Sequence, residues 1–127
     1  MPINPNPVVW FEIPASDIDR AKTFYESAFD AELSLNEMGP NKMACFPMAM
    51  GGPGAGGTLI QGEGYTPSHS GSVVYLGVQK IDEALAKIGE ARGTTLMPRI
   101  SIGEHGHIAH FEDSEGNRVA LHEAPAS

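Results

Sequence analysis

The hydrophobic and polar positions of this chain follow the same order of patterns twice. Each half begins with a short run rich in β-branched and aromatic residues, at residues 8–13 and 72–78, which predicts a strand. A stretch with apolar residues at helical spacing then follows in each half. The apolar positions are Ile18, Ala21, Tyr25, Ala28 and Phe29 in the first half, and Ile81, Ala84, Leu85, Ile88 and Ala91 in the second. These stripes predict one amphipathic helix per half.

The residues flanking the two stripes predict helix ends of different quality. Asp17 stands where an N-cap is needed, because its side-chain oxygen can accept a hydrogen bond from an amide of the first turn. Lys80 holds the corresponding place in the second half and is a poor cap. Gly93 follows the second stripe, where a glycine often ends a helix.

Three more short strands are predicted after each helix. They lie at about residues 31–36, 42–48 and 58–61 in the first half, and at 95–100, 107–112 and 118–122 in the second. Residues 51–57 are too rich in glycine for a strand and are predicted to form a flexible loop. Each half is therefore a βαβββ module.

A shift of 63 residues aligns the two modules with each other, which indicates an internal duplication. We expect an α+β fold in one domain spanning residues 1–127. Module one covers about residues 7–61, a linker covers 62–71, and module two covers 72–123. Neither module can bury a sheet alone, so the linker is not expected to separate two domains.

Charge and cysteine content narrow the functional classes. The 127 residues contain 16 Asp and Glu against 8 Lys and Arg, for a formal net charge of −8. Such a chain repels nucleic acid and anionic membrane surfaces, so neither is an expected partner. No apolar run is long enough to cross a membrane. The single cysteine, Cys45, excludes an intrachain disulfide and fits a reducing compartment, so we expect a cytoplasmic protein.

Two sequence blocks, residues 10–21 with Phe24 and Tyr25, and residues 110–123, carry a family resemblance. The chain resembles the vicinal oxygen chelate superfamily, which includes glyoxalase I, bleomycin-resistance proteins and extradiol dioxygenases. The resemblance implies two tandem βαβββ modules that form an open eight-stranded cup with the ligand or metal inside. It also implies a homodimer, as does the need to cover free strand edges.

The positions that hold the metal in metal-dependent members carry unsuitable residues here. The resemblance places these positions at Trp10, Val73 and Ala120, with a fourth in the region of residues 59–61. Tryptophan, valine and alanine cannot bind a divalent cation, which requires carboxylate, imidazole or thiolate ligands. We therefore predict no cofactor at this place.

Strand residues two positions further along face the same side as those lost ligands. These are Glu12, Tyr75 and His122, with Gln61 as a possible fourth member. A carboxyl group flanked by apolar strands is poorly solvated and can serve as a general acid or base, so Glu12 and His122 are candidate catalytic residues. The alternative is that Glu12 and His122 form a buried hydrogen-bonded pair of structural value only.

Candidate ligand-binding residues complete the set. We select Trp10, Gln61, Tyr75 and Met43 within the cup, and Glu104 and His105 at its rim. Met43 is chosen because a flexible, polarizable side chain suits an apolar pocket that accepts varied ligands. His105 and His107 have the spacing of a relocated metal site, although His110 has the opposite strand parity.

Three functions remain open. The first is a metal-independent protein that binds a small, partly apolar metabolite or drug. The second is a metal-dependent lyase or dioxygenase with its ligands moved to Glu12, His122 and Gln61 or to the rim histidines. The third is a metal-free, isomerase-like enzyme that uses Glu12 and His122 as acid and base. The first is preferred, and whether the protein is an enzyme stays open.

Overall fold

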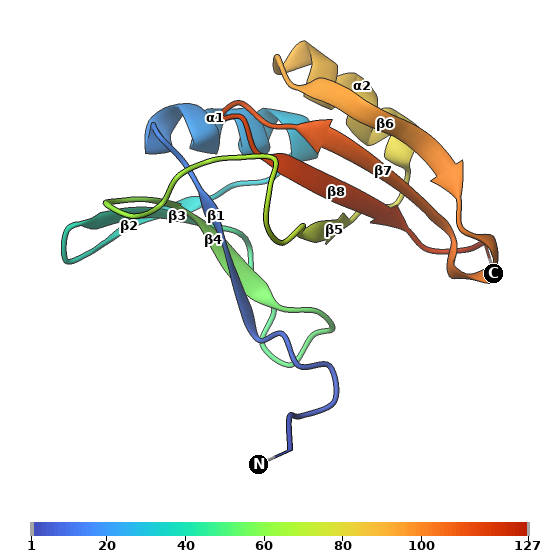
Figure 1. Ribbon diagram of the computed structural model, residues 1–127, viewed down its shortest axis with the longest axis horizontal. Coiled ribbons are helices and arrows are strands. Elements are labelled where there is room, and N and C mark those ends of the chain that lie inside the picture. Colours follow the sequence, from blue (N-terminus) through green and yellow to red (C-terminus); the bar gives the residue numbers. More distant parts are fainter. Residues whose placement is uncertain (1, 127) are drawn as a thin grey trace.

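The computed structural model describes residues 2–126 and contains the two βαβββ modules that the sequence predicts (Figure 1). Module one consists of β1 (Trp10–Pro14), α1 (Ile18–Phe29), β2 (Ser34–Met38), β3 (Asn41–Cys45) and β4 (Gly56–Gln61). Module two consists of β5 (Tyr75–Gly77), α2 (Ile81–Glu90), β6 (Thr94–Ser101), the 3₁₀ helix η1 (Gly103–His105), β7 (His107–Glu112) and β8 (Arg118–Glu123). The predicted α+β class is confirmed.

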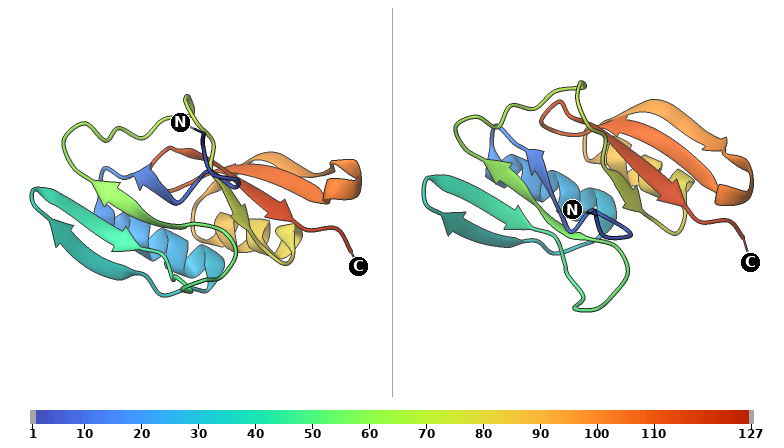
Figure 2. Two further views of the ribbon diagram at one scale, coloured as in Figure 1. Left: turned by 90° about the horizontal axis from the view of Figure 1, so that it is seen from below. Right: turned by 60° about the horizontal axis from the view of Figure 1, so that its bottom comes forward.

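The strands form two four-stranded sheets that lie side by side, with both helices in a second layer (Figure 2). The strand orders are β1-β4-β3-β2 and β5-β8-β7-β6. β1 runs parallel to β4 and β5 runs parallel to β8, while the other pairs are antiparallel. The two sheets are not joined by hydrogen-bonded strands in the part of the chain that is described, so the cup is open between β1 and β5. None of the helices between residues 2 and 126 is long and apolar enough to cross a membrane.

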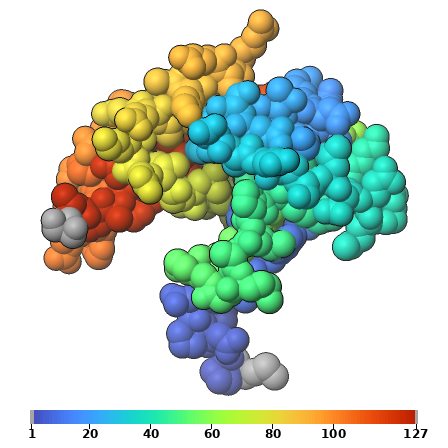
Figure 3. Space-filling view, turned by 180° about the vertical axis from the view of Figure 1, so that it is seen from behind, coloured from blue at the N-terminus to red at the C-terminus, as the bar shows by residue number. Residues whose placement is uncertain are grey.

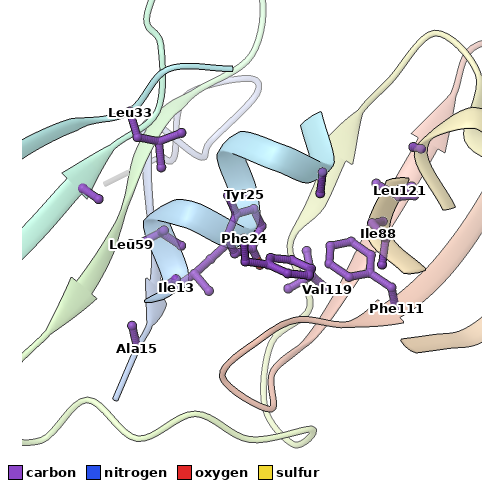
Figure 4. Close-up of a cluster of buried hydrophobic side chains, with 14 of the residues drawn as sticks. Ile13, Ala15, Phe24, Tyr25, Leu33, Leu59, Ile88, Phe111, Val119 and Leu121 are labelled. Atoms are coloured by element: carbon purple, nitrogen blue, oxygen red, sulfur yellow. The ribbon is translucent and has the colours of Figure 1, made fainter. Parts of the chain in front are cut away.

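The hydrophobic core lies between the helices and the sheets and is shared by both modules (Figure 4). The stripe predicted for α1 is buried at Ile18, Ala21, Tyr25 and Ala28. Phe24, which the stripe omitted, is buried as well, because α1 also packs against α2 and its aromatic rings meet Phe111 of the second sheet. Its ring and that of Tyr25 lie 6.3 and 6.4 Å from the ring of Phe111 in β7.

The last strand of each module supports the first turn of the helix in the same module. Gln61 Oε1 accepts a hydrogen bond from the Ile18 amide at 2.8 Å, and Glu123 Oε1 accepts one from the Ile81 amide at 2.9 Å. Asp17 also caps α1 as predicted, through the amide of Arg20. Lys80 provides no side-chain cap, so the carboxylate of Glu123 satisfies an amide that would otherwise lack a partner.

Two predicted roles for glycine are wrong. At the end of α2 it is Arg92, with φ of 74°, that adopts the left-handed conformation, and not Gly93. Gly93 is required for a different reason, since a Cβ there would lie 2.9 Å from the carbonyl oxygen of Glu112. The loop predicted at residues 51–57 ends earlier, because Gly56 and Gly57 belong to β4. Gly57 leaves room for the Phe11 ring, which would be 2.4 Å from an added Cβ.

The turn between β7 and β8, residues 113–117, binds the start of α1 through Glu115. The Glu115 side chain is only 1% exposed, and it accepts two hydrogen bonds from Arg20, at 2.7 and 2.9 Å. It also accepts bonds of 2.9 Å from the amides of Ser16 and Asp17. Burial alone raises the pKa of this carboxyl, but the hydrogen bonds outweigh burial and hold the pKa below its ordinary value.

A second buried carboxylate in the same turn, Asp113, connects to the middle of α1. Its Oδ2 accepts a 2.7 Å hydrogen bond from the Tyr25 hydroxyl, and its Oδ1 accepts bonds from the amides of Glu115 and Asn117. Asn117 Nδ2 donates to the carbonyl of Pro14 at 2.7 Å. Burial and then Asp113 raise the pKa of Tyr25 well above its ordinary value, so this tyrosine stays a hydrogen-bond donor.

Acidification is expected to destabilise the protein through Glu115. Because the folded-state pKa of Glu115 is lowered, its stabilising contribution is complete above the ordinary carboxyl pKa and is lost as the pH falls through the folded-state value. Glu115→Gln is therefore expected to lower the free energy of unfolding by about 1–3 kcal/mol at pH 7 and by less at pH 3. Urea unfolding at both pH values measures the difference.

Glu63→Gln is the control for this experiment, because Glu63 is exposed in the loop after β4. It is expected to change the free energy of unfolding by no more than about 0.5 kcal/mol at either pH. An equal loss for Glu115→Gln at pH 7 and pH 3 would contradict the ionic role of Glu115.

Candidate functional site

The largest hollow described in the molecule lies between the two sheets and has a volume of about 1050 Å³. Its walls are residues 6–9 of the N-terminal arm, Phe11, the loop and strand start at 52–56, and residues 72–75. The arm and the loop project together from the body of the molecule (Figure 3). The lining is mainly valine, proline, glycine and alanine, and its few polar residues are Asn6, Ser72 and Tyr75. This composition suits a small apolar molecule.

Trp10 and Glu12 lie on the open face of the first sheet, the side away from α1. Strand alternation requires this, because Ile13 between Glu12 and Pro14 is buried in the core. Trp10 is 40% exposed. Glu12 is exposed, so the expectation that its carboxyl group is poorly solvated is wrong. The open gap between the sheets leaves Glu12 in contact with water.

The structure does not bring Glu12 and His122 together. Glu12 lines a small hollow of about 160 Å³ together with Arg118, the first residue of β8, with the linker residues Ser68 and Ser70, and with Ser72. His122 lies near the opposite end of β8, where its Nε2 donates to the His105 carbonyl at 2.8 Å. Neither a hydrogen bond nor a hollow shared by Glu12 and His122 is found in residues 2–126.

Gln61 lies on the opposite side of its sheet from the predicted one, whereas Met43 pairs with Ile60 on the open face, as predicted. Gln61 has the same strand parity as Leu59, but Leu59 is fully buried in the core, so this parity faces α1. The amide of Gln61 is accordingly bound to the start of α1, and the expectation that it faces the cup is wrong. Met43 is 7% exposed beside Ile60 in the first sheet, which leaves little of its side chain accessible in one chain.

The two rim residues are accessible but not held in place. The side chains of Glu104 and His105 are 89% and 77% exposed, with a separation of 3.8 Å between a carboxylate oxygen of Glu104 and Nε2 of His105. Both residues lie in η1, and their link to His122 is the hydrogen bond that the His105 backbone carbonyl accepts from His122 Nε2. Such an exposed pair is weakly coupled and adds little fixed geometry.

A polar group that sequence reasoning missed lies on the open face of the second sheet. It consists of Tyr75, His110 and Arg118, from the neighbouring strands β5, β7 and β8. The Tyr75 oxygen lies 3.3 Å from His110 Nε2, and Arg118 Nη1 lies 2.9 Å from His110 Nδ1. Tyr75 and His110 meet across Ala120, which pairs with both. The small side chain of Ala120 leaves room for this contact.

The sequence pattern singles out His110 only for a strand parity opposite to that of His105 and His107 in a relocated metal site. His107 and His110 both belong to β7 and face opposite sides of the sheet. His107 lies on the helix side, next to Arg99. His110 faces the opposite side, with Tyr75. Burial and then the positive charge of Arg118 lower the pKa of His110 below its ordinary value. Only the register of β5, β8 and β7, in which Ala120 pairs with both Tyr75 and His110, brings this group together.

The residues present do not fit the metal site that the resemblance implied. Ala120 and Trp10 have no ligand atom for a divalent cation, and Val73 lies before the start of β5. The residues of β4 on the open face are Thr58 and Ile60, not a carboxylate or histidine. No three His, Cys, Asp or Glu side chains converge as metal ligands anywhere between residues 2 and 126. The alternative ligand sets, Glu12 with His122 and Gln61 or the rim histidines, do not converge on one point in this part of the chain either.

Comparison with known proteins places these features in a family. Residues 8–121 match the Glyoxalase/Bleomycin resistance protein/Dioxygenase superfamily. A glyoxylase-like domain-containing protein from Didymella fabae is 29% identical over 119 residues, which cover 87% of this chain and 88% of that protein.

Solved structures share the fold at low sequence identity. A glyoxylase/bleomycin resistance protein/dioxygenase domain from Frankia sp. EAN1pec matches with a TM-score of 0.71 and 14% identity, over 93% of this chain and 97% of that one. An antibiotic-binding protein from Streptomyces sp. CB03234 matches with a TM-score of 0.66 and 20% identity, over 98% and 99%. Glyoxalase I from Zea mays matches with a TM-score of 0.69 and 20% identity, over 92% of this chain but only 46% of its own length.

Removing the charge of Arg118 is expected to raise the pKa of His110. In Arg118→Met the repulsion between the guanidinium and a protonated His110 is absent, while burial still holds the pKa below its ordinary value. NMR titration of the His110 ring measures the change. Arg99→Met, which removes a cation next to His107, is the control and is expected to leave His110 unaffected. An unchanged His110 titration in Arg118→Met would contradict the contact.

Proposed function

We propose that this chain, which belongs to the Glyoxalase/Bleomycin resistance protein/Dioxygenase superfamily, binds a small, partly apolar molecule between its two sheets without the family's usual metal. The observation that carries the proposal is the hollow of about 1050 Å³, with a mainly apolar lining that includes Tyr75. Concave, mostly apolar surfaces with few polar groups are typical of small-molecule sites. A structural neighbour described as antibiotic-binding supports the same class of ligand.

The chemistry of the open face supports binding more than catalysis. Glu12 is exposed, and His122 donates to a backbone carbonyl at the other end of β8. An acid–base pair requires both groups within reach of one bound substrate, and Glu12 and His122 share neither a hydrogen bond nor a described hollow. We therefore place Tyr75 at the ligand, with Trp10 and Glu12 on the adjoining open face of the first sheet, and leave His122, Glu104 and His105 to the rim. The single cysteine supports a cytoplasmic location.

A homodimer is part of the proposal. β1 and β5 are both edge strands, and Val8, Val9 and Trp10 expose apolar surface along the same edge of module one. Exposed edges and adjoining apolar side chains favour pairing with another chain. A second copy would cover this edge and close the hollow between the sheets. The projecting arm at residues 6–9 supplies further surface for that contact.

Binding is expected to depend on Val9, which lines the hollow. Trp10 is the single tryptophan and lies in the chain between Val9 and Phe11, which both line the hollow, so its fluorescence serves as the binding signal. We expect 2-ethylnaphthalene to quench Trp10 saturably, and Val9→Asp to weaken binding by about tenfold or more, because a charge then borders the apolar ligand. EDTA is expected to leave the affinity unchanged.

The control for Val9→Asp is Ile102→Asp, since Ile102 is also exposed but lies outside the hollow. It is expected to keep the affinity of the unmodified protein. Equal weakening by both substitutions would argue against this site. One Ni, Zn, Fe or Mn ion per chain in the purified, tag-free protein would overturn the metal-independent reading.

The dimer is expected to depend on the exposed edge of module one. Val8→Lys introduces a charge beside β1 without disturbing the core, because the Val8 side chain is 64% exposed. Sedimentation velocity is expected to give a dimer for the unmodified chain and a shift towards monomer for Val8→Lys. A monomeric unmodified chain at micromolar concentration would contradict the proposed dimer.

A further inference from the structure

Tyr75 is the polar side chain best placed to meet a ligand in the large hollow. Tyr75 is one of the residues that line that hollow, and it is 50% exposed. The ring meets His110 edge-on, with 5.7 Å between the ring centroids. The hydroxyl oxygen lies within hydrogen-bond distance of His110 Nε2. One side of this hydroxyl is therefore held by the protein, and the other is available on the open face.

The hydrogen-bond directions within the group follow from the chemistry of Arg118. A guanidinium can only donate, so His110 Nδ1 must accept from Arg118 Nη1. The single proton of the neutral imidazole then resides on Nε2, which donates to the oxygen of Tyr75. The lowered pKa of His110, caused by burial and by Arg118, keeps the imidazole neutral at physiological pH.

This order leaves Tyr75 as a donor. Its oxygen accepts from His110, so the hydroxyl proton is directed away from His110 towards the open face. A hydroxyl that already accepts one hydrogen bond is a stronger donor, because hydrogen bonds in a chain polarise one another. Most residues that line the hollow with Tyr75 are apolar, among them Val9, Val73 and Val74, and the other polar residues of the lining are Asn6 and Ser72.

We propose that Tyr75 selects apolar ligands that carry a hydrogen-bond-accepting oxygen, such as an aromatic ketone, and that His110 and Arg118 are its positioning residues. This inference rests on the proposed ligand-binding function and names the chemical class of its ligand. The hydrocarbon part of the ligand packs against the valines and the ring of Tyr75. The carbonyl oxygen accepts the Tyr75 proton, and no bond is made or broken.

A pair of probes with the same shape tests this inference. 2-Acetylnaphthalene has a carbonyl oxygen and 2-ethylnaphthalene does not, so the ratio of their affinities isolates the hydrogen bond. Trp10 fluorescence in the full-length protein measures both. Tyr75→Phe is expected to lower the ketone-to-hydrocarbon affinity ratio by about five- to tenfold, while the affinity for 2-ethylnaphthalene stays within about twofold.

Variants of Arg118 test the positioning role. Arg118→Met is expected to lower the ratio by about two- to threefold, and Arg118→Lys, which keeps a cationic donor, is expected to restore most of it. The His110 titration, measured in the same variants, must shift in Arg118→Met for the effect to come through His110. Tyr65→Phe in the linker is the matched tyrosine control and is expected to leave the ratio unchanged.

The outcomes separate the two proposals. If both probes bind and Tyr75→Phe leaves their ratio unchanged, the role of Tyr75 is overturned while ligand binding stands. If neither probe gives saturable quenching of the unmodified protein, the proposed binding function fails, and the inference fails with it. Thermal melting shows whether Tyr75→Phe is folded. An unfolded variant would lose affinity for both probes, whereas loss of the hydrogen bond lowers only the affinity for the ketone.

Discussion

The arrangement of the two modules depends on a buried negative charge, the carboxylate of Glu115. A carboxylate that is almost fully removed from water must find several donors, and the start of α1 supplies them through Arg20 and two backbone amides. These donors belong to module one and the carboxylate to module two, so satisfying the charge fixes one module against the other. A second hydrogen bond crosses the same boundary, in which the neutral hydroxyl of Tyr25 donates to the carboxylate of Asp113. Both contacts join module two to the helix of module one, next to the hydrophobic core that the modules share.

The two modules start their helices in the same way but differ in the connection between their last two strands. The candidate site lies beside the longer of these connections. Gln61 and Glu123 occupy equivalent places, where each accepts a hydrogen bond from the first amide of its helix, α1 or α2. The connection between β7 and β8 is a short turn bound to α1, whereas the equivalent connection between β3 and β4 is a longer glycine-rich loop that borders the hollow. The turn in module two therefore holds the fold together, while its counterpart in module one is available to a ligand.

The two sheets contribute different chemistry to the open face. The first provides apolar surface around Trp10, and the second provides the ordered polar group of Tyr75, His110 and Arg118. A ligand that touches both sheets must therefore be mainly apolar and polar at one point. This division agrees with the loss of metal ligands, because the small side chain at Ala120 opens the space that Tyr75 and His110 share.

The sequence by itself determined the order of helices and strands, the cap at Asp17 and the shared face of Trp10 and Glu12, because these depend on local periodicity and neighbouring residues. It did not determine that Gln61 faces a helix, that Glu12 is exposed, or that His110 meets Tyr75. Those facts depend on strand register and on the distance between the two sheets. Both are set by contacts between residues far apart in the chain, which only the tertiary structure brings together.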